Sequence, residues 1–212
     1  MILLILILVC SDCAKPTKNQ EQSETKKYNS AFAVNNGISK PTLVNPATKA
    51  KDLKIDTSFI GITGYSSGGH LAALAGASSY DRSVEGNVGK FLNFSSHIDA
   101  VVDFYGPTDM SVFDGCLKRM GKEFKSPRKI PLFDNFVDQV PKEVQRANPI
   151  TYIKENSPPF LIFHGENDLT VPICQSKILH EALLKKGVNS ELIIDKYGDH
   201  CCLLYTSDAA DE

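Results

Sequence analysis

Three side chains in this sequence are of the types that nucleophilic catalysis needs. Each follows an apolar stretch and lies beside a turn, so the three could act together. Ser66 lies in "GYSSG", Asp168 in "HGENDLTVP" and His200 in "YGDHC". A serine hydroxyl is a poor nucleophile until a base takes its proton, and a histidine oriented by an acid is a suitable base. We therefore predict acyl transfer, with Ser66 as nucleophile, His200 as general base and Asp168 as the acid.

The segment "GYSSG" (64–68) fits the pattern G-x-S-x-G, between a strand-like run and an alanine-rich, helix-like run. A strand that enters a helix through such a turn is the context expected of a nucleophile elbow. The turn strains the serine backbone, and the flanking glycines leave room for it. The backbone N–H of Ser67 would begin the helix and hold an oxyanion, whereas its hydroxyl lies too far along to attack. A small-residue turn that only packs helix on strand is the alternative.

Four other side chains near these turns have simpler explanations. His70 lies one turn into the expected helix, which favours a packing or capping role. His164 ends a strand, where it is expected to brace the loop of the predicted acid. Asp109 in "GPTDM" follows another strand and is an alternative acid. Asp199 adjoins His200, but adjacent side chains diverge, so it is a poor partner for the imidazole.

The elements that must position these residues follow from the alternation of apolar and polar stretches after residue 57. Apolar runs predict buried strands, and intervening periodic stretches predict helices. The strands are expected at 59–63, 98–106, 158–165 and 190–198, and the helices at 67–77 and 173–186. Strands that alternate with helices predict an α/β fold with a mostly parallel sheet flanked by helices.

Each predicted helix has an expected face. The first carries Leu71, Leu74 and Ala75 on one face, and the second is expected to turn inward Cys174, Ile178, Ala182 and Leu183. The carboxyl ends of parallel strands meet at one edge, where α/β sites assemble. The three candidate residues each follow such an end, and their order along the chain, Ser-Asp-His, is that of α/β hydrolases.

A long insert, about 111–142, separates the second and third predicted strands. Its stretch "CLKRMGKEFKSPRK" is strongly basic, which is typical of a solvated face. A cap over a pocket that favours anionic groups is the alternative.

Composition is that of an ordinary globular protein. The chain has 212 residues, 42% of them hydrophobic and 23% charged, and a formal net charge of −2, so no nucleic-acid partner is indicated. The six cysteines show no repeated metal-ligand spacing, so we assign no metal and predict no disulfide framework. A single bridge between Cys116 and Cys174 is left open. Acyl transfer by a serine also needs no cofactor.

The first 14 residues are read as an export signal or lipoprotein leader. They begin with "MILLILILV", which is too short to span a bilayer but suits the apolar part of such a signal. Cys10 is then a candidate lipid-bearing cysteine, and the protein is expected to be secreted, periplasmic or tethered at a bacterial cell envelope. A buried strand or a misassigned start codon is the alternative. Residues 15–57 are polar and predict a tether.

Residues from about 50 to 200 resemble the α/β-hydrolase superfamily, specifically the bacterial esterase/lipase-like carboxylesterases related to feruloyl-esterase domains. The segments that carry the resemblance are "IDTSFIGITGYSSGGHLAALAG", "VVDFYGPTDM", "ANPITYI", "PPFLIFHGENDLTVP" and "YGDH". The resemblance implies an α/β-hydrolase domain at 58–201 and a serine hydrolase that cleaves esters, often acyl or acetyl groups on plant polysaccharide. A small-molecule or polysaccharide ester is therefore the expected substrate.

The sequence departs from that family at both ends. The family carries an HGGG-type motif on an earlier strand, which supplies the second oxyanion donor, and no such motif precedes Ser66. The first strands of the usual sheet are therefore expected to be missing. The ending "CLLYTSDAADE" (202–212) resembles the conceptual translation of a sequencing adapter, which predicts a non-native tail on a gene fragment.

Two other functions fit part of this pattern. A serine peptidase of the prolyl oligopeptidase type shares the elbow and the order of acid and histidine. A non-catalytic remnant, kept as a binding or structural protein, could retain the elbow without turnover.

Overall fold

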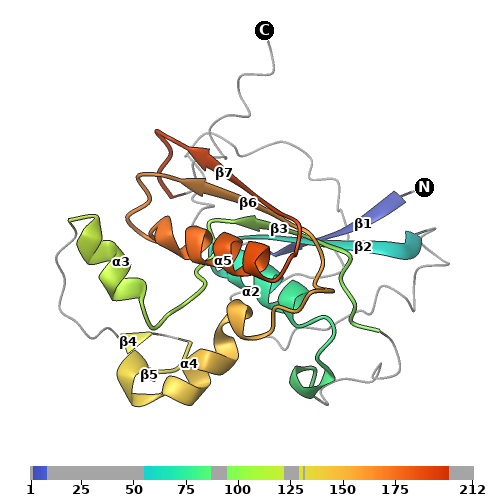
Figure 1. The fold of residues 1–212 in the computed structure, drawn as a ribbon, viewed down its shortest axis with the longest axis horizontal. Helices are drawn as coiled ribbons and strands as arrows, with labels where there is room; N and C mark the ends of the chain where they lie inside the picture. The colour runs from blue at the N-terminus through green and yellow to red at the C-terminus, as the bar shows by residue number, and fades with distance from the viewer. Residues whose placement is uncertain (1, 9–54, 87–94, 122–128, 131, 201–212) are drawn as a thin grey trace, which may run out of the picture.

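The structure is a computed structural model, and it describes residues 2–8, 55–86, 95–121, 129–130 and 132–200. Its centre is a five-stranded sheet in the order β1-β2-β3-β6-β7, in which every neighbouring pair is parallel. The strands are β1 (Ile2–Leu8), β2 (Ile55–Tyr65), β3 (Ala100–Phe104), β6 (Phe160–Gly165) and β7 (Ser190–Asp195). The carboxyl ends of all five strands therefore lie at one edge (Figure 1).

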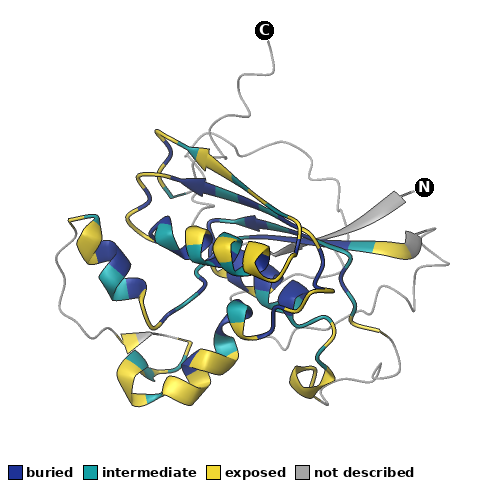
Figure 2. Ribbon diagram, viewed as in Figure 1, coloured by how far each residue is buried: buried dark blue, intermediate teal, exposed yellow. Residues whose placement is uncertain are grey.

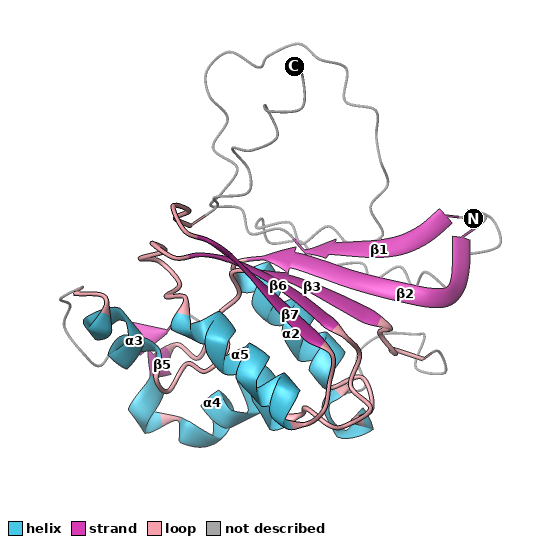
Figure 3. Cartoon of the chain, turned by 45° about the horizontal axis from the view of Figure 1, so that its top comes forward, coloured by secondary structure: helices cyan, strands magenta, loops and turns pink. Residues whose placement is uncertain are grey.

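Two helices, α2 (Ser67–Ala77) and α5 (Cys174–Lys185), lie against the same face of the sheet (Figure 3). The predicted insert is built from small elements, which are α3 (Phe113–Arg119), the antiparallel pair β4 (Lys129–Ile130) and β5 (Asn135–Phe136), η3 (Val137–Gln139) and α4 (Pro141–Ala147). Two further 3-10 turns are η2 (Arg82–Val84) and η4 (Pro149–Thr151). The predicted α/β class, with a mostly parallel sheet and flanking helices, is confirmed.

The main core lies between the sheet and these two helices (Figure 2). Side chains at alternate strand positions point into it, as the pleat of a strand requires. They include Ile62, Val101, Phe160 and Ile162. Helix α2 meets them with small residues, and a Cβ added to Gly76 would overlap the Val101 side chain. Of the face expected from sequence, Leu74 and Ala75 pack partly against this core, whereas Leu71 is 45% exposed.

The buried face of α5 differs from the predicted one. Leu183 is buried as expected and Ala182 packs partly against the core, but Ile178 is half-buried. The fully buried positions are Gln175, Ser176, Leu179 and Leu183. Gln175 and Ser176 face inward because their side chains have hydrogen-bond partners there. Gln175 accepts from the backbone N–H of Thr108, and the Ser176 hydroxyl bonds the His164 ring. The periodicity of apolar residues along the helix cannot reveal such partners.

The N-terminal segment forms part of the sheet. β1 pairs in parallel with β2, so residues 2–8 adopt the strand that was the alternative to an export leader. The leader itself stays a prediction, as do most of the tether, the lipid-bearing Cys10 and the tail at 202–212, because residues 9–54 and 201–212 lie outside the described residues. The predicted tether ends too late, because residues 55–57 already belong to β2. Over the described segments, no helix combines the length and apolar character needed to cross a membrane.

Candidate active site

A strained serine joins β2 to α2. Ser66 has φ 54° and ψ −120°, a backbone conformation that L-residues rarely adopt. Its N–H donates to the carbonyl of Phe104 over 2.9 Å, and its own carbonyl accepts from the N–H of His70 over 3.0 Å. Backbone hydrogen bonds from a neighbouring strand and from the helix therefore hold the strained residue in place.

The residue two positions before the serine must be glycine for this turn to close. A Cβ added to Gly64 would lie far inside 3.0 Å of the Gly68 carbonyl, which is backbone and cannot swing away. Ser67 is the first residue of α2 and is exposed. Its N–H belongs to the first turn, where amide groups have no acceptor within the helix and carry partial positive charge.

The imidazole of His200 bridges the other two predicted residues. Its Nε2 lies 3.0 Å from Ser66 Oγ, and its Nδ1 lies 2.6 Å from Asp168 Oδ2. The three side chains come from the β2–α2 turn, the loop after β6 and the segment after β7, at the shared carboxyl edge of the sheet. Tyr105, fully buried, sets its ring edge-on to the His200 ring, with centroids 4.7 Å apart and planes at 61°.

The buried carboxylate of Asp168 is fully hydrogen-bonded. Its Oδ1 accepts from the backbone N–H groups of Thr170 and Val171, each over 2.8 Å. Burial alone would raise the pKa of Asp168, but hydrogen bonds from His164 and His200, the charge of His200 and the Val171 amide together lower it to about 2. Asp168 is therefore ionised at neutral pH and can orient an imidazole that carries its proton on Nδ1.

His164 lies beneath the acid and is fully enclosed. Its Nδ1 lies 2.6 Å from Ser176 Oγ, and its Nε2 lies 2.8 Å from the Val171 carbonyl and 3.4 Å from Asp168 Oδ2. An Nε2–H shared between the last two oxygens, with Nδ1 accepting from the serine hydroxyl, satisfies every contact. This arrangement agrees with the expected bracing role of His164.

The other residues considered from sequence lie away from this line of hydrogen bonds. His70 is buried, its Nδ1 is 2.8 Å from the Pro107 carbonyl, and burial lowers its pKa despite that bond. The Asp109 carboxylate accepts from Ser111 and from Asn148 instead of meeting His200. Asp199 is exposed. The packing role expected of His70 agrees with its surroundings.

Sequence reasoning overlooked two buried residues beside the elbow. Asp103 is fully buried in β3, where its Oδ1 accepts from the N–H of Gly106 over 3.0 Å. Burial raises the pKa of Asp103 to about 6, although that hydrogen bond and the charge of His164 oppose the shift. Tyr105 has φ 45° directly after the strand. A single carboxylate inside an apolar strand could have indicated that Asp103 is buried. No feature of the nearby sequence indicates the position of Tyr105.

A hollow of about 580 Å³ lies along the outer side of α2, next to α4. Its lining includes His70, Leu74, Leu132, Phe133 and Arg146. None of Ser66, Asp168 and His200 lines it, so the candidate site is defined by the hydrogen-bonded line and not by this hollow.

Comparison with known proteins gives one family. The profile of the BD-FAE family matches residues 45–183. Among curated proteins, the chain is 32% identical over 137 residues to Esterase LipQ of Mycobacterium tuberculosis, covering 62% of this chain and 30% of the relative. It is also 32% identical over 127 residues to the Probable carboxylic ester hydrolase LipM of the same organism, covering 58% and 27%. The chain therefore spans less than a third of these curated relatives.

Solved structures agree with that match. A truncated form of a carbohydrate esterase from gut microbiota superposes with a TM-score of 0.67 at 32% identity, covering 78% of this chain and 62% of that one. A bifunctional GH43-CE protein from Bacteroides eggerthii gives a TM-score of 0.65 at 38% identity, covering 73% and 23%. These neighbours share the α/β-hydrolase arrangement of sheet and helices.

Proposed function

Because this chain belongs to the BD-FAE family, within the α/β-hydrolase esterases, we propose that it carries the catalytic centre of a carboxylic ester hydrolase. Ser66 Oγ attacks the acyl carbonyl while His200 Nε2 takes its proton. The imidazolium then gives that proton to the leaving alcohol, and an acyl-serine remains. Water, activated by the same imidazole, releases the acid and restores the hydroxyl.

The single observation that carries the proposal is the continuous line from Ser66 Oγ through both ring nitrogens of His200 to Asp168. The 2.6 Å contact to an ionised carboxylate favours the tautomer with Nδ1 protonated. Nε2 is then free to accept the serine proton. The charge of Asp168 also stabilises the imidazolium that forms in the attack.

We assign the oxyanion to the N–H of Ser67. It follows the nucleophile at the start of α2, where the helix dipole favours negative charge. In the family the second donor comes from an HGGG-type motif, and no such motif precedes Ser66 in this sequence. Losing one such donor costs roughly a hundred- to a thousandfold in turnover, so the activity of this chain alone depends on whether that donor is present.

We propose acyl or acetyl esters on polysaccharide as the substrate class. Two structural neighbours support it, one a carbohydrate esterase from gut microbiota and the other an acetyl ester-xyloside bifunctional hydrolase from Caldicellulosiruptor lactoaceticus. Release of acetate from acetylated xylan, compared with deacetylated xylan, tests it. Turnover of p-nitrophenyl acetate with no acetate from xylan would limit the proposal to simple esters.

Covalent labelling tests the nucleophile itself. A fluorophosphonate should modify the folded chain at Ser66, Ser66→Ala should abolish labelling, and Ser67→Ala, one residue further, should retain it. Hydrolysis of p-nitrophenyl acetate but not of a dipeptide anilide would separate an esterase from a prolyl oligopeptidase-type peptidase. A folded chain with no label at Ser66 would instead be a non-catalytic remnant.

A further inference from the structure

The backbone of Val171 contacts the Asp168 carboxylate directly through its N–H and indirectly, through His164, by its carbonyl. The N–H of Val171 donates to Asp168 Oδ1, and its carbonyl accepts from His164 Nε2, which also lies 3.4 Å from Asp168 Oδ2. A shift of the peptide units around Val171 would therefore move the carboxylate and its brace together. The position of the acid depends on what holds Val171.

Helix α3 of the insert holds the Val171 side chain. Val171, Phe113 and Leu117 form a buried apolar cluster of their own, separate from the main core. Three side chains bury little apolar area, so this contact alone would fix α3 only weakly against the loop. The cluster needs a second connection to be rigid.

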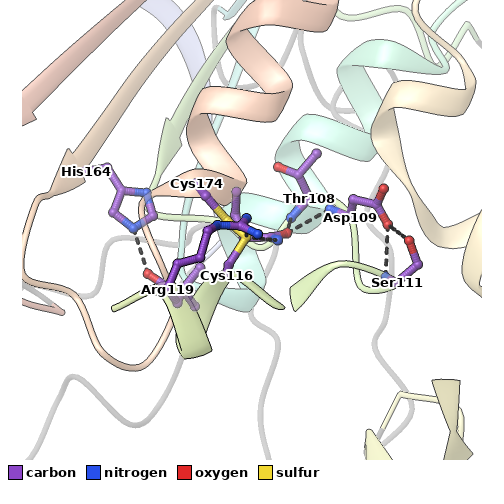
Figure 4. The surroundings of a disulfide bond; sticks show 9 residues. Thr108, Asp109, Ser111, Cys116, Arg119, His164 and Cys174 are labelled. Carbon is purple, nitrogen blue, oxygen red and sulfur yellow. Dashed lines mark hydrogen bonds between the residues drawn. A yellow bond between two sulfur atoms is a disulfide. The ribbon is translucent and has the colours of Figure 1, made fainter. Parts of the chain in front are cut away.

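A disulfide between Cys116 and Cys174 supplies that connection (Figure 4). Cys116 precedes Leu117 in α3, and Cys174 follows Val171 by three residues at the start of α5, with a Cα–Cα distance of 6.1 Å. It joins residues 58 positions apart, so it removes much conformational freedom between the insert and the loop.

The side chain of Gln175, next to Cys174, connects the loop after β3 to the disulfide. Its Oε1 accepts from the backbone N–H groups of Thr108 and Asp109, over 2.8 and 2.7 Å, while its Nε2 points to Cys116 Sγ at 3.8 Å. Gln175 is fully buried. The loop after β3, helix α3 and the start of α5 therefore converge on the disulfide, directly beside the acid loop.

We propose that α3 and its disulfide form a clamp, made of Phe113, Cys116, Leu117, Val171 and Cys174, that positions Asp168 for catalysis. This inference rests on the proposed function and adds a thiol-sensitive control of it. The clamp acts on Asp168 through the backbone groups of Val171. A dithiol that donates two electrons and two protons converts the disulfide to two thiols and itself becomes a cyclic disulfide, which frees α3 from the loop.

The consequence is a change in kcat and not in KM. A displaced acid misorients the base in the transition state but leaves binding of the ester unchanged. Misplacement of catalytic groups by about 1 Å costs up to about a hundredfold, so we expect kcat to fall between about ten- and a hundredfold. Amide exchange at Thr170 and Val171, which donate to Asp168, should quicken at least about tenfold.

The experiment compares the oxidised chain, the chain reduced by dithiothreitol and the variant Cys116→Ala/Cys174→Ala, with disulfide content followed by intact mass. A variant with alanine at Cys10, Cys13, Cys201 and Cys202 keeps the clamp and should respond to dithiothreitol as the parent does. Val171→Ala keeps the disulfide but loosens the cluster, and it should lower kcat with KM unchanged. The kcat and the amide exchange of the double variant should match those of the reduced parent and should not change when dithiothreitol is added.

Two results would overturn the clamp. A rise in KM at constant kcat would assign α3 to substrate binding, and unchanged exchange at 170–171 after full reduction would show that the loop needs no clamp. The exchange measurement needs no turnover, so it decides the matter even if Ser66 proves unreactive. An oxidised chain that fails to label but shows faster exchange on reduction would reject the proposed function and keep the clamp.

Discussion

The elbow that carries Ser66 and the loop that carries Asp168 follow two strands of one sheet, β2 and β6, which are separated by β3, yet they are held in different ways. The elbow is fixed through backbone atoms alone, by a positive φ at Ser66, the close approach of Gly64 to Gly68 and the hydrogen bond from the Ser66 N–H to the Phe104 carbonyl of β3. The acid loop takes ordinary turn hydrogen bonds, and His164 and helix α3 hold it from outside. Local strain gives an all-or-none position, whereas tertiary contacts give one that can be loosened by degrees.

The largest effect is expected where the elbow cannot adapt. Gly64→Ala puts a methyl group into the backbone carbonyl of Gly68, so the turn must open and Ser66 must leave its site. We expect no fluorophosphonate labelling and a loss of more than about 3 kcal/mol in the free energy of unfolding. Labelling and denaturant titration measure the two effects.

Gly115→Ala is the matched control for that substitution. Its Cβ would meet Arg119 at 3.7 Å, an ordinary contact, and it lies within α3, where alanine favours the helix by about 0.5–1 kcal/mol. Normal labelling and equal or higher stability are expected. If Gly64→Ala labelled as well as Gly115→Ala, backbone strain would not be what positions the nucleophile.

The next effect concerns the acid. Asp168→Asn keeps the shape of the side chain but removes the charge and favours the wrong tautomer of His200, so kcat should fall by about ten thousandfold. Asp109→Asn is the matched control, because that carboxylate bonds Ser111 and Asn148 instead. Steady-state kinetics on p-nitrophenyl acetate separates them. A larger loss from Asp109→Asn would reverse the assignment of the acid.

This contrast also explains what the sequence could and could not predict. The expected helix at 67–77 coincides with α2, and Asp168 and His200 follow the carboxyl ends of β6 and β7, as the sequence predicts. These positions follow from local signals, namely glycines, short apolar runs and chain order. The elbow could be predicted because the glycines and the apolar run that mark it lie within a few residues, although one of its hydrogen-bond acceptors, the Phe104 carbonyl, comes from β3.

The surroundings of the acid were not readable in the same way. The pairing of Cys116 with Cys174, and of Leu117 with Val171, joins residues more than fifty positions apart, and no spacing rule predicts them. The inward face of α5 was misjudged because Gln175 is buried to bond backbone amides near Thr108. Hydrogen-bond partners that arrive from elsewhere in the fold override apolar periodicity.

A smaller effect tests the carboxylate beneath the elbow. Burial raises the pKa of Asp103 to about 6 in the folded chain, above its ordinary value of 3.8, so the folded state holds a proton that the unfolded state has lost. Stability from this group is therefore present below about pH 4 and declines as the pH rises to about 6. Asp103→Asn lacks that titration, so its stability relative to the parent should rise by on the order of 3 kcal/mol between pH 4 and 7.

The Asp103 test compares how the free energy of unfolding changes with pH in the parent and in Asp103→Asn. Asparagine can keep the hydrogen bond from Gly106, and any fixed cost of its amide group shifts both ends of the pH range equally. Denaturant titrations at several pH values measure the difference. Parallel curves for parent and variant would mean that Asp103 is solvated or paired and gives the elbow no pH dependence.

The smallest effect has the opposite sign and belongs to the acid loop. The pKa of Asp168 is lowered to about 2, so the folded state binds this proton less readily than the unfolded state. Its contribution is therefore complete above about pH 5 and is lost as the pH falls toward 2, about 2 kcal/mol in all. The stability advantage of the parent over Asp168→Asn should shrink by that amount in acid, as followed by thermal melts. An advantage that stays constant down to pH 2 would mean that hydrogen bonds to a neutral carboxyl, and not to a carboxylate, hold the loop.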